Sequence, residues 1–308
     1  MPPLLGHILP VFLVLGAGAA LRASGVADER WTEVINRYAL YAGFPVLIFA
    51  NLAGIDGGTL AGLLPVIWLN AVLMAGLIGV TAAAARLARL PGERSNTYVI
   101  CLFFGNVAYL GYPVVTSVYP ETEAMVSILV SAYVAVLFTA GVFVLELSRK
   151  QRSSAGSIFG GMVKNPFIVA VAAGFAAIYT GVSLPQPVAR AMDMIRASVS
   201  PMVLIALGVF LVRKIDLRSL LRPTLVLSAL KLAAVPAFFY LALYLALPPG
   251  VPGTALHVSV LEAAMPVAVT PFALSSVYPL DRELVGSSIV LSTLLSALSL
   301  PLLIFLLG

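Results

Sequence analysis

FGNVAYLGYP at residues 104–113 and EAAMPVAVTP at residues 262–271 each interrupt a long apolar segment of the chain. The first stretch holds two glycines, an asparagine and a proline, and the second holds two prolines and a carboxylate. Glycine and proline weaken a helix. Backbone groups freed inside lipid must be sheltered by protein or line a cavity. The two stretches therefore predict helices that are broken within a membrane, although a lone proline can also merely kink a packed helix.

The composition of the whole chain agrees with a membrane location. The 308 residues are 61% hydrophobic and 10% charged, and the mean hydropathy is +1.05. A soluble domain has about half of its residues apolar and about a quarter charged, and a disordered chain is more polar still. Both classes are excluded. The single cysteine, Cys101, excludes a disulfide framework and a cysteine-based metal site.

Apolar stretches separated by charged residues or Gly/Pro turns predict an all-α polytopic membrane protein with ten transmembrane helices. The expected spans are residues 4–22, 33–52, 60–85, 96–118, 124–147, 165–180, 188–212, 219–247, 255–278 and 283–307. A span takes about 20 residues, so the length leaves no room for a sizeable soluble domain.

The basic residues predict the orientation. Fifteen of the eighteen Lys and Arg residues lie in odd-numbered loops or flank them, and the second, fourth and eighth loops have none. Arg190 and Arg196 are mild exceptions to this pattern. Because cytoplasmic loops are enriched in Lys and Arg, the odd loops should be cytoplasmic and both termini outside. The positive net charge then reflects topology, and no nucleic-acid partner is expected.

The two halves of the chain repeat each other. Pro10, Gly18, Gly25 and Val26 recur 156 residues later, and the tetrapeptide SVYP at 117–120 recurs at 276–279. Five spans in each half are an odd number, so residues 1–147 and 165–308 should form two inverted five-helix repeats. Residues 148–164 would be a cytoplasmic linker between them. Inverted repeats with paired broken helices are typical of secondary transporters, whose substrate site lies near the bilayer midplane.

The broken fourth and ninth spans are therefore the predicted substrate site. Half-helix N-terminal ends attract anions, whereas C-terminal ends and freed carbonyls attract cations. The candidate substrate-binding residues lie in or beside the breaks, except for Lys231 in the eighth span. They are Gly105, Asn106, Tyr112, Pro113, Met265, Pro266, Thr270 and Lys231.

Two ionisable residues lie well inside predicted spans, which makes each a functional hypothesis. Glu262 in the ninth span has three open roles: it ligates Na⁺, takes up a proton, or pairs with Lys231. Lys231 attracts an anionic substrate, neutralises Glu262, or extends its ammonium to the membrane surface.

Serines at helical spacing in the fifth and tenth spans are the other candidates for an ion site. Ser127 and Ser131 share one helix face, as do Ser288, Ser292 and Ser296. Hard cations prefer oxygen ligands, so Ser127, Ser131 and Ser292 are expected to join Glu262 at a coupling-ion site for Na⁺ or H⁺. Helix packing through small polar residues is the alternative.

No nucleotide-binding, zinc or nucleophile motif is present. We expect neither a cofactor nor an enzyme.

Together these residues resemble the auxin efflux carrier family, and the likeness covers nearly the whole chain. It is carried by ILPVF at 8–12, GV at 25–26, NRY at 36–38, GNVAYLGYP at 105–113, EAAMP at 262–266 and LSTLLS at 291–296. The resemblance implies the ten-helix fold shared with bile acid sodium symporters. In that fold, spans 1, 2, 6 and 7 form a scaffold and dimer-forming domain. Spans 3–5 and 8–10 form a transport domain, in which spans 4 and 9 cross.

The resemblance also implies elevator-type movement of an organic anion. Asn106 matches the crossover asparagine that helps to hold a carboxylate in plant carriers. Glu262 begins a stretch similar to the E-x-G-M-Q of the sodium symporters, whose glutamate ligates sodium, but Pro266 replaces the glutamine. Ala264 and Pro266 stand where a second asparagine would be, which argues against auxin itself as the substrate.

The sequence thus predicts a secondary transporter of a small organic carboxylate in a bacterial-type plasma membrane. It would contact membrane lipid and form a homodimer through the scaffold. A channel or facilitator on the same fold is the alternative. An intramembrane enzyme or a sensor is a third class, for which the chain lacks a nucleophile–base pair and an appended soluble domain.

Overall fold

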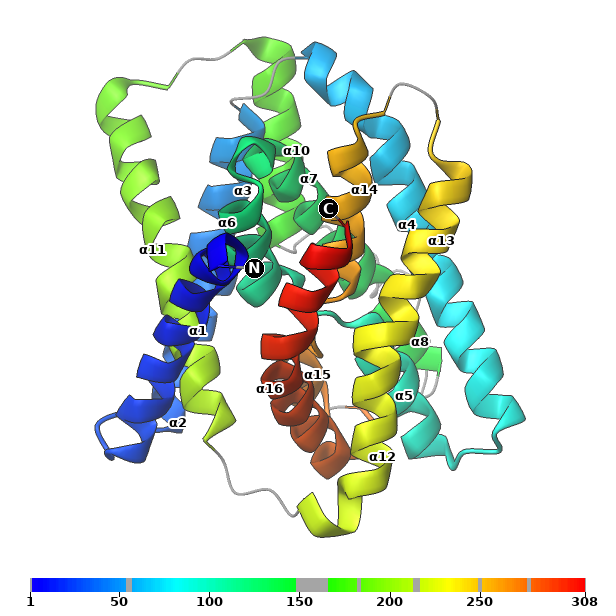
Figure 1. The fold of residues 1–308 in the computed structure, drawn as a ribbon. Coiled ribbons are helices and arrows are strands. Elements are labelled where there is room, and N and C mark those ends of the chain that lie inside the picture. Colours follow the sequence, from blue (N-terminus) through cyan, green and yellow to red (C-terminus); the bar gives the residue numbers. More distant parts are fainter. Residues whose placement is uncertain are drawn as a thin grey trace. The chain divides into compact units, whose positions relative to one another are not determined.

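The computed structural model describes residues 2–53, 57–147, 166–181, 184–212, 217–248, 251–275 and 278–307. These residues form helices, and no strand longer than one isolated bridge occurs among them. The expected linker at 148–164 lies outside the described residues. The chain forms two compact units, which are described separately below (Figure 1).

Unit 1 consists of residues Met1–Ile67, Ala108–Ala135 and Phe159–Arg213. Its helices are α1 (Pro2–Ala23), α2 (Glu29–Tyr38), the π-helix η1 (Ala39–Gly43), α3 (Phe44–Ala53), α6 (Tyr112–Val118), the 3₁₀ turn η3 (Pro120–Thr122), α10 (Pro166–Thr180) and α11 (Gln186–Leu211). The boundary between the units falls inside three further helical segments. They are α4 (Gly57–Leu87), the π-helix η2 (Val107–Gly111) and α7 (Glu123–Val136).

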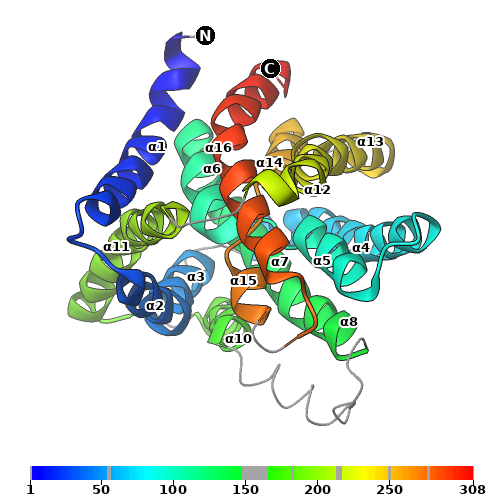
Figure 2. The same cartoon turned by 90° about the horizontal axis from the view of Figure 1, so that it is seen from below.

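Unit 2 consists of residues Trp68–Val107, Val136–Ile158 and Lys214–Gly308. Its helices are α5 (Gly92–Phe103), the π-helix η4 (Leu137–Gly141), α8 (Val142–Leu147), α12 (Leu217–Ala229), the π-helix η5 (Leu230–Ala234), α13 (Val235–Ala246), α14 (Gly253–Ala263), α15 (Thr270–Leu274) and α16 (Arg282–Leu307). Segments α12, η5 and α13 follow one another without a gap, and α12 packs beside α16 (Figure 2).

Each expected span coincides with a helix or with consecutive helical segments, and the ends agree within four residues. Among the described residues, four helices are long and apolar enough to cross a membrane alone: Ala61–Leu87, Gln186–Leu211, Leu221–Ala246 and Arg282–Leu307. Shorter apolar helices occupy Leu9–Ala23, Val107–Val118, Met125–Val134 and Ile168–Thr180. The protein is therefore an all-helical polytopic membrane protein, whereas the count of ten crossings and the inverted repeat stay predictions.

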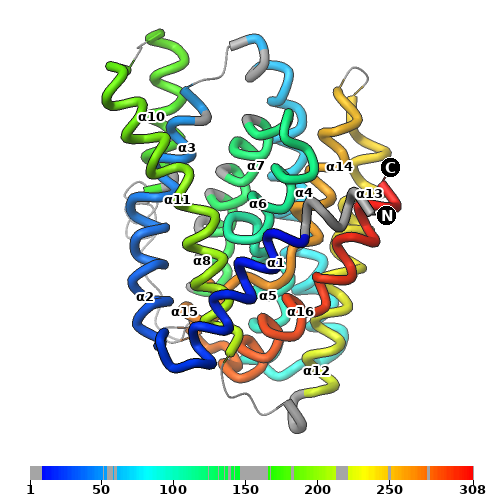
Figure 3. The backbone as a smooth tube through the Cα atoms, turned by 60° about the vertical axis from the view of Figure 1, so that its left-hand side comes forward, coloured from blue at the N-terminus to red at the C-terminus, as the bar shows by residue number. Residues whose placement is uncertain are grey.

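Close backbone packing between α1 and α11 organises unit 1. A Cβ atom added to Gly18 would overlap the backbone of Ile205, and one added to Gly208 would overlap the carbonyl oxygen of Leu15. The two helices can approach this closely only because glycine has no side chain at either position. In the same unit α3 packs along α10 (Figure 3).

Gly18 and Gly16 make a matched pair for testing this contact. We expect Gly18→Ala to destabilise the protein by about 1–3 kcal/mol, the usual cost of inserting atoms into a packed core. Nothing lies within 4 Å of a Cβ at Gly16, so Gly16→Ala should leave stability unchanged or raise it through helix propensity. Thermal unfolding in detergent measures both. Equal melting temperatures for the two variants would contradict the packing.

Two glycines that the sequence pairs at an offset of 156 share a backbone conformation. Gly25 follows α1 with φ of 79°, and Gly181 follows α10 with φ of 62°. This left-handed conformation is open to glycine at little cost and commonly ends a helix. The local agreement explains why glycine stands at both positions.

Candidate functional site

The two broken helices meet at their breaks, within unit 2. Helix α5 ends at Phe103 and α14 ends at Ala263, and residues 104–106 and 264–269 between them and the next helical segments are unwound. The backbone N–H of Asn106 donates to the carbonyl of Pro266 at 2.8 Å, and that of Ala268 donates to the carbonyl of Phe104 at 2.9 Å. These bonds form an antiparallel bridge between Gly105 and Val267. The predicted breaks are confirmed, and each satisfies backbone groups of the other, as a non-aqueous interior requires.

Lys231 ties the ends of both half-helices together. Its side chain extends from η5 and is 2% exposed. The ammonium Nζ donates to the carbonyls of Leu102 at 3.1 Å and Ala263 at 3.3 Å. These carbonyls lie at the C-terminal ends of α5 and α14, where helix dipoles place partial negative charge. The positive charge of the ammonium therefore stabilises the two C-terminal helix ends, which both carry partial negative charge.

The backbone at Gly105 runs directly beside this ammonium. A Cβ atom at Gly105 would lie 3.1 Å from Lys231 Nζ. A larger residue would have to displace the ammonium or the unwound segment, which accounts for glycine at the centre of the break.

Glu262 lies in the last turn of α14 and is fully buried. Neither carboxylate oxygen has a hydrogen-bond partner among the residues that the structure describes. Within the same residues Lys231 and Glu262 form no ion pair, because the ammonium bonds to backbone carbonyls instead. A buried carboxylate without a partner is costly unless a proton or a cation neutralises it. The geometry thus favours the two hypotheses in which Glu262 binds a proton or Na⁺.

Asn106 carries an unused donor at the break. Its side chain is 4% exposed, and in the described part of the chain its amide nitrogen Nδ2 has no hydrogen-bond partner. Buried amide groups are nearly always paired. A buried donor without a partner, at the same break that holds the Lys231 ammonium, is suited to a bound anion.

The other predicted residues of unit 2 lie in or beside the second unwound segment. Met265 and Pro266 are buried within it, and Thr270 begins the short helix α15. The hydroxyl oxygen of Ser292 on α16 accepts the backbone N–H of Val267 at 3.1 Å. Ser292 therefore holds the unwound segment in place.

Four predicted residues belong to unit 1. The hydroxyl of Tyr112 donates to the Glu123 carboxylate at 2.8 Å, and the hydroxyl of Ser127 donates to the Glu123 backbone carbonyl at 2.8 Å. Pro113 is buried in the first turn of α6. Ser131 is in α7, and its side chain lies outside the described residues. The predicted set is thus divided between the two units, and its unit 2 members lie in or beside the paired breaks or bond to them.

Some of the residues that build the site belong to no sequence motif and could not be predicted from the sequence. The carbonyls of Leu102 and Ala263 hold Lys231 through backbone atoms, which any residue type would provide. Asn70 in α4 donates to the hydroxyl of Ser259 in α14 at 2.9 Å, which links these two helices. The sequence signal for that bond is only that Asn70 is a polar residue inside an apolar span.

The site therefore contains donors that can bind an anion and a carboxylate that can bind a cation or a proton. The Asn106 amide and the Lys231 ammonium can hold an anion, since an ammonium has three N–H groups and two of them bond to carbonyls. The Glu262 carboxylate can hold a proton or a hard cation. The described residues contain no group of three or more His, Cys, Asp or Glu that could hold a metal ion.

Comparison with known proteins shows that the chain is similar to membrane transporters. A family model described as "Membrane transport protein" matches residues 3–160 and 152–304. An uncharacterized transporter of Methanothermobacter thermautotrophicus is 28% identical over 96% of this chain and 95% of its own length. An uncharacterized transporter of Methanocaldococcus jannaschii is 23% identical, with 96% of each chain covered. A protein of Rhizobium meliloti named "Putative malonate transporter" is 26% identical over 66% of this chain and 64% of its own length.

Proposed function

Since the chain belongs to the membrane transport protein family, that of the auxin efflux carriers, we propose that it is a secondary transporter of a small organic anion. The protein is a multi-pass membrane transporter and not an enzyme. The substrate is a carboxylate, and the membrane is a bacterial-type plasma membrane with both termini outside. The name of the Rhizobium meliloti relative supports a small carboxylate such as malonate.

The observation that carries this proposal is the buried amide of Asn106, which has no partner among the described residues, at the same break that holds the ammonium of Lys231. Among the described residues the amide nitrogen has no acceptor, although buried donors are nearly always paired. The ammonium is held near the same break by the ends of α5 and α14 and has one N–H to spare. A carboxylate bound there accepts from the Asn106 amide and from the ammonium. Hydrogen bonds to a charged group contribute about 1.5–3 kcal/mol each.

Glu262 is the coupling group of the proposed transporter. Its buried carboxylate carries no protein partner among the described residues, so it binds H⁺ or Na⁺ when the transport cycle brings either ion to it. The energy of that ion's gradient then drives accumulation of the anion. Of the serines predicted for the ion site, Ser127 donates to a backbone carbonyl within unit 1, and Ser292 accepts the backbone N–H of Val267 at the second break. Their part in ion binding stays a prediction.

We further propose the elevator movement and the homodimer that the family resemblance implies. The expected scaffold spans 1, 2, 6 and 7 correspond to α1, α2–α3, α10 and α11, all within unit 1. The expected mobile set is spans 3–5 and 8–10. Spans 8–10 correspond to α12–α16, all within unit 2, whereas the helices of spans 3–5 are divided between the two units. The grouping of α12–α16 supports movement of spans 8–10 as one body.

The experiment that tests the substrate site is a thermal-unfolding screen of the purified protein with mono- and dicarboxylates. A ligand that binds the folded state raises its stability, by about 2.7 kcal/mol at a concentration one hundred times Kd. We expect at least one small carboxylate to raise the melting temperature. In Asn106→Leu, whose side chain is branched at the same atom but has no donor, we expect the affinity for that carboxylate to fall by about 10- to 100-fold.

Asn70→Leu is the control, because it also removes a buried amide of unit 2 but at a bond between helices. We expect it to lower the melting temperature without changing the carboxylate affinity. Unchanged affinity in Asn106→Leu would remove the proposed substrate site from the first break.

A further inference from the structure

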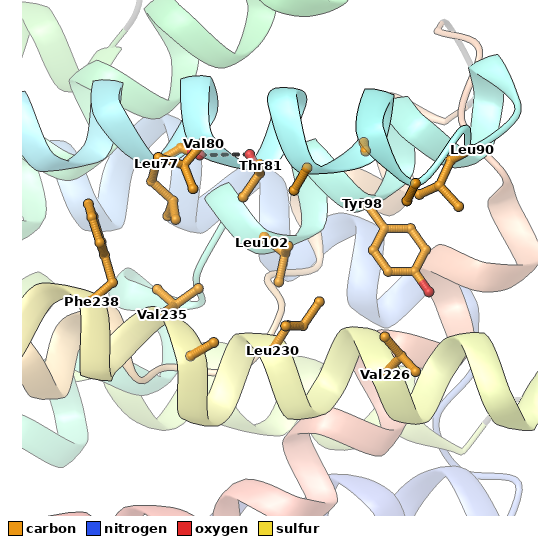
Figure 4. Close-up of a pocket in the computed structure, with 14 residues that line it drawn as sticks. Leu77, Val80, Thr81, Leu90, Tyr98, Leu102, Val226, Leu230, Val235 and Phe238 are labelled. Atoms are coloured by element: carbon orange, nitrogen blue, oxygen red, sulfur yellow. Dashed lines mark hydrogen bonds between the residues drawn. The ribbon is translucent and has the colours of Figure 1, made fainter.

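A cavity of about 370 Å³ lies in unit 2 among α4, α5 and the continuous helix α12–η5–α13 (Figure 4). Its size falls in the usual range for small-molecule sites, about 300–1,000 Å³. The lining residues are Leu77, Val80, Thr81, Ala84, Ala85, Ala88, Leu90, Tyr98, Leu102, Val226, Leu230, Ala234, Val235 and Phe238. Apart from one threonine and one tyrosine, these side chains are apolar.

The two polar side chains of the lining are already hydrogen-bonded within the protein. The hydroxyl of Thr81 donates to the carbonyl of Leu77 at 2.7 Å, drawn as a dashed line in Figure 4. The hydroxyl of Tyr98 donates to the carbonyl of Pro223 at 3.0 Å. Since neither donor is free, the body of the cavity is suited to an apolar occupant.

One end of the cavity is basic. Leu90, Tyr98 and Val226 line this end, whereas Leu77 and Phe238 line the other (Figure 4). Arg89 directly precedes Leu90 in the chain, and Arg222 lies one helical turn before Val226 on the same face of α12. Both arginines therefore stand at the same end of the cavity.

These two arginines are available to a ligand. Both are exposed, and neither side chain has an ion pair or a hydrogen bond to the described part of the chain. Arg94, one turn before Tyr98, adds positive charge there while pairing with Asp281 at 3.6 Å. An arginine fork binds a phosphate oxygen pair well.

The apolar cavity matches the acyl chain of a membrane lipid, and the basic end matches its phosphate headgroup. Outside the cavity the same helices expose large apolar side chains, among them Val72 on α4 and Leu241 and Leu245 on α13, as a surface in contact with acyl chains would. Arg89 lies in the third loop, and Arg222 lies near the start of α12, just after the seventh loop. The charge pattern predicts that both loops are cytoplasmic. Anionic lipids of the cytoplasmic leaflet attract basic residues there.

We propose that this cavity binds one anionic phospholipid of the cytoplasmic leaflet. An acyl chain fills the space among α4, α5 and α13, and the phosphate headgroup binds Arg89 and Arg222. The lipid joins α4 to α13 across the opening and stabilises unit 2. The ligand of this site differs from the proposed substrate, because this site binds an apolar acyl chain whereas the substrate site binds a carboxylate.

The test compares phosphatidylglycerol with phosphatidylcholine added to the delipidated full-length protein in detergent. Lipid retained by the intact protein is counted by native mass spectrometry, and thermal unfolding is followed in parallel. We expect wild type to retain phosphatidylglycerol in preference and to unfold at a higher temperature with it. In the double variant Arg89→Gln/Arg222→Gln we expect affinity to fall by about fivefold for each arginine removed, and the preference to disappear. Arg37→Gln on α2 is the control for a lost surface charge.

A second pair of variants tests the apolar part. Ala84 lines the cavity, and Ala83 next to it does not, so Ala84→Phe should abolish lipid retention whereas Ala83→Phe should not. Equal retention of both lipids by wild type would overturn the headgroup assignment. Phosphatidylglycerol bound by Ala84→Phe as tightly as by wild type would overturn the cavity. If Ala84→Phe fails to fold, the lipid preference of Arg89→Gln/Arg222→Gln tests the proposal, and an unchanged preference would overturn it.

Discussion

Lys231→Met is expected to lose anion uptake almost entirely, by about 100-fold or more. Methionine keeps an unbranched side chain of similar length but removes the charge and all donors. The carbonyls of Leu102 and Ala263 then lose their partner at the ends of α5 and α14. An unsatisfied buried polar group costs about 1–3 kcal/mol, so two of them loosen the paired breaks. The substrate carboxylate also loses its positive partner.

Uptake by proteoliposomes and thermal unfolding together measure this effect. We expect the melting temperature of Lys231→Met to fall by several degrees, since about 1 kcal/mol corresponds to about 2–4 °C for a domain of 150–250 residues. Leu232→Met is the matched control, because it places the same side chain on a neighbouring, half-buried position of η5 that does not line the cavity. Full uptake in Lys231→Met would show that the ammonium neither holds the breaks nor attracts the substrate.

Glu262→Gln is expected to abolish accumulation of the anion against its gradient. The amide has nearly the shape of the carboxylate but cannot take up a proton and binds a cation poorly. Exchange of labelled for unlabelled substrate should persist, because the anion site at the first break is intact. We expect stability in the absence of substrate to be kept or raised, since an unpaired buried carboxylate is replaced by a neutral group.

The measurement is uptake with imposed Na⁺ and pH gradients, each applied separately. Wild type should respond to one of them and Glu262→Gln to neither. Glu93→Gln, an exposed residue in the first turn of α5, controls for loss of a carboxylate and should behave as wild type does. Gradient-driven accumulation at the wild-type level in Glu262→Gln would exclude Glu262 as the coupling group.

Much of the fold could be predicted because lipid imposes strong constraints on sequence. Apolar length marks the helices, and the ends of α11 and α16 lie within two residues of the expected spans. Gly and Pro mark the breaks, since both residue types weaken a helix for reasons that do not depend on the rest of the protein.

The site was predicted less completely, for a physical reason. The residue types of Asn106, Lys231 and Glu262 identify them, because polar groups are costly in an apolar span. What each one bonds to depends on backbone atoms that every residue possesses. The carbonyls that hold Lys231 and the bridge between Gly105 and Val267 therefore have no sequence signature. The serines show the same limit: a hydroxyl can ligate an ion or support a backbone, and Ser292 accepts the N–H of Val267.

The central claim is that the paired breaks bind a small organic anion and move it against its gradient. Accumulation of labelled malonate by proteoliposomes tests it most directly, with the strongest ligand of the thermal screen used if that is another carboxylate. Under an imposed ion gradient we predict an internal concentration above the external one in wild type, and none above it in Asn106→Leu. Uptake that stops at equal concentrations would indicate a facilitator, and uptake unaffected by Asn106→Leu would place the anion elsewhere. Either result would contradict the account.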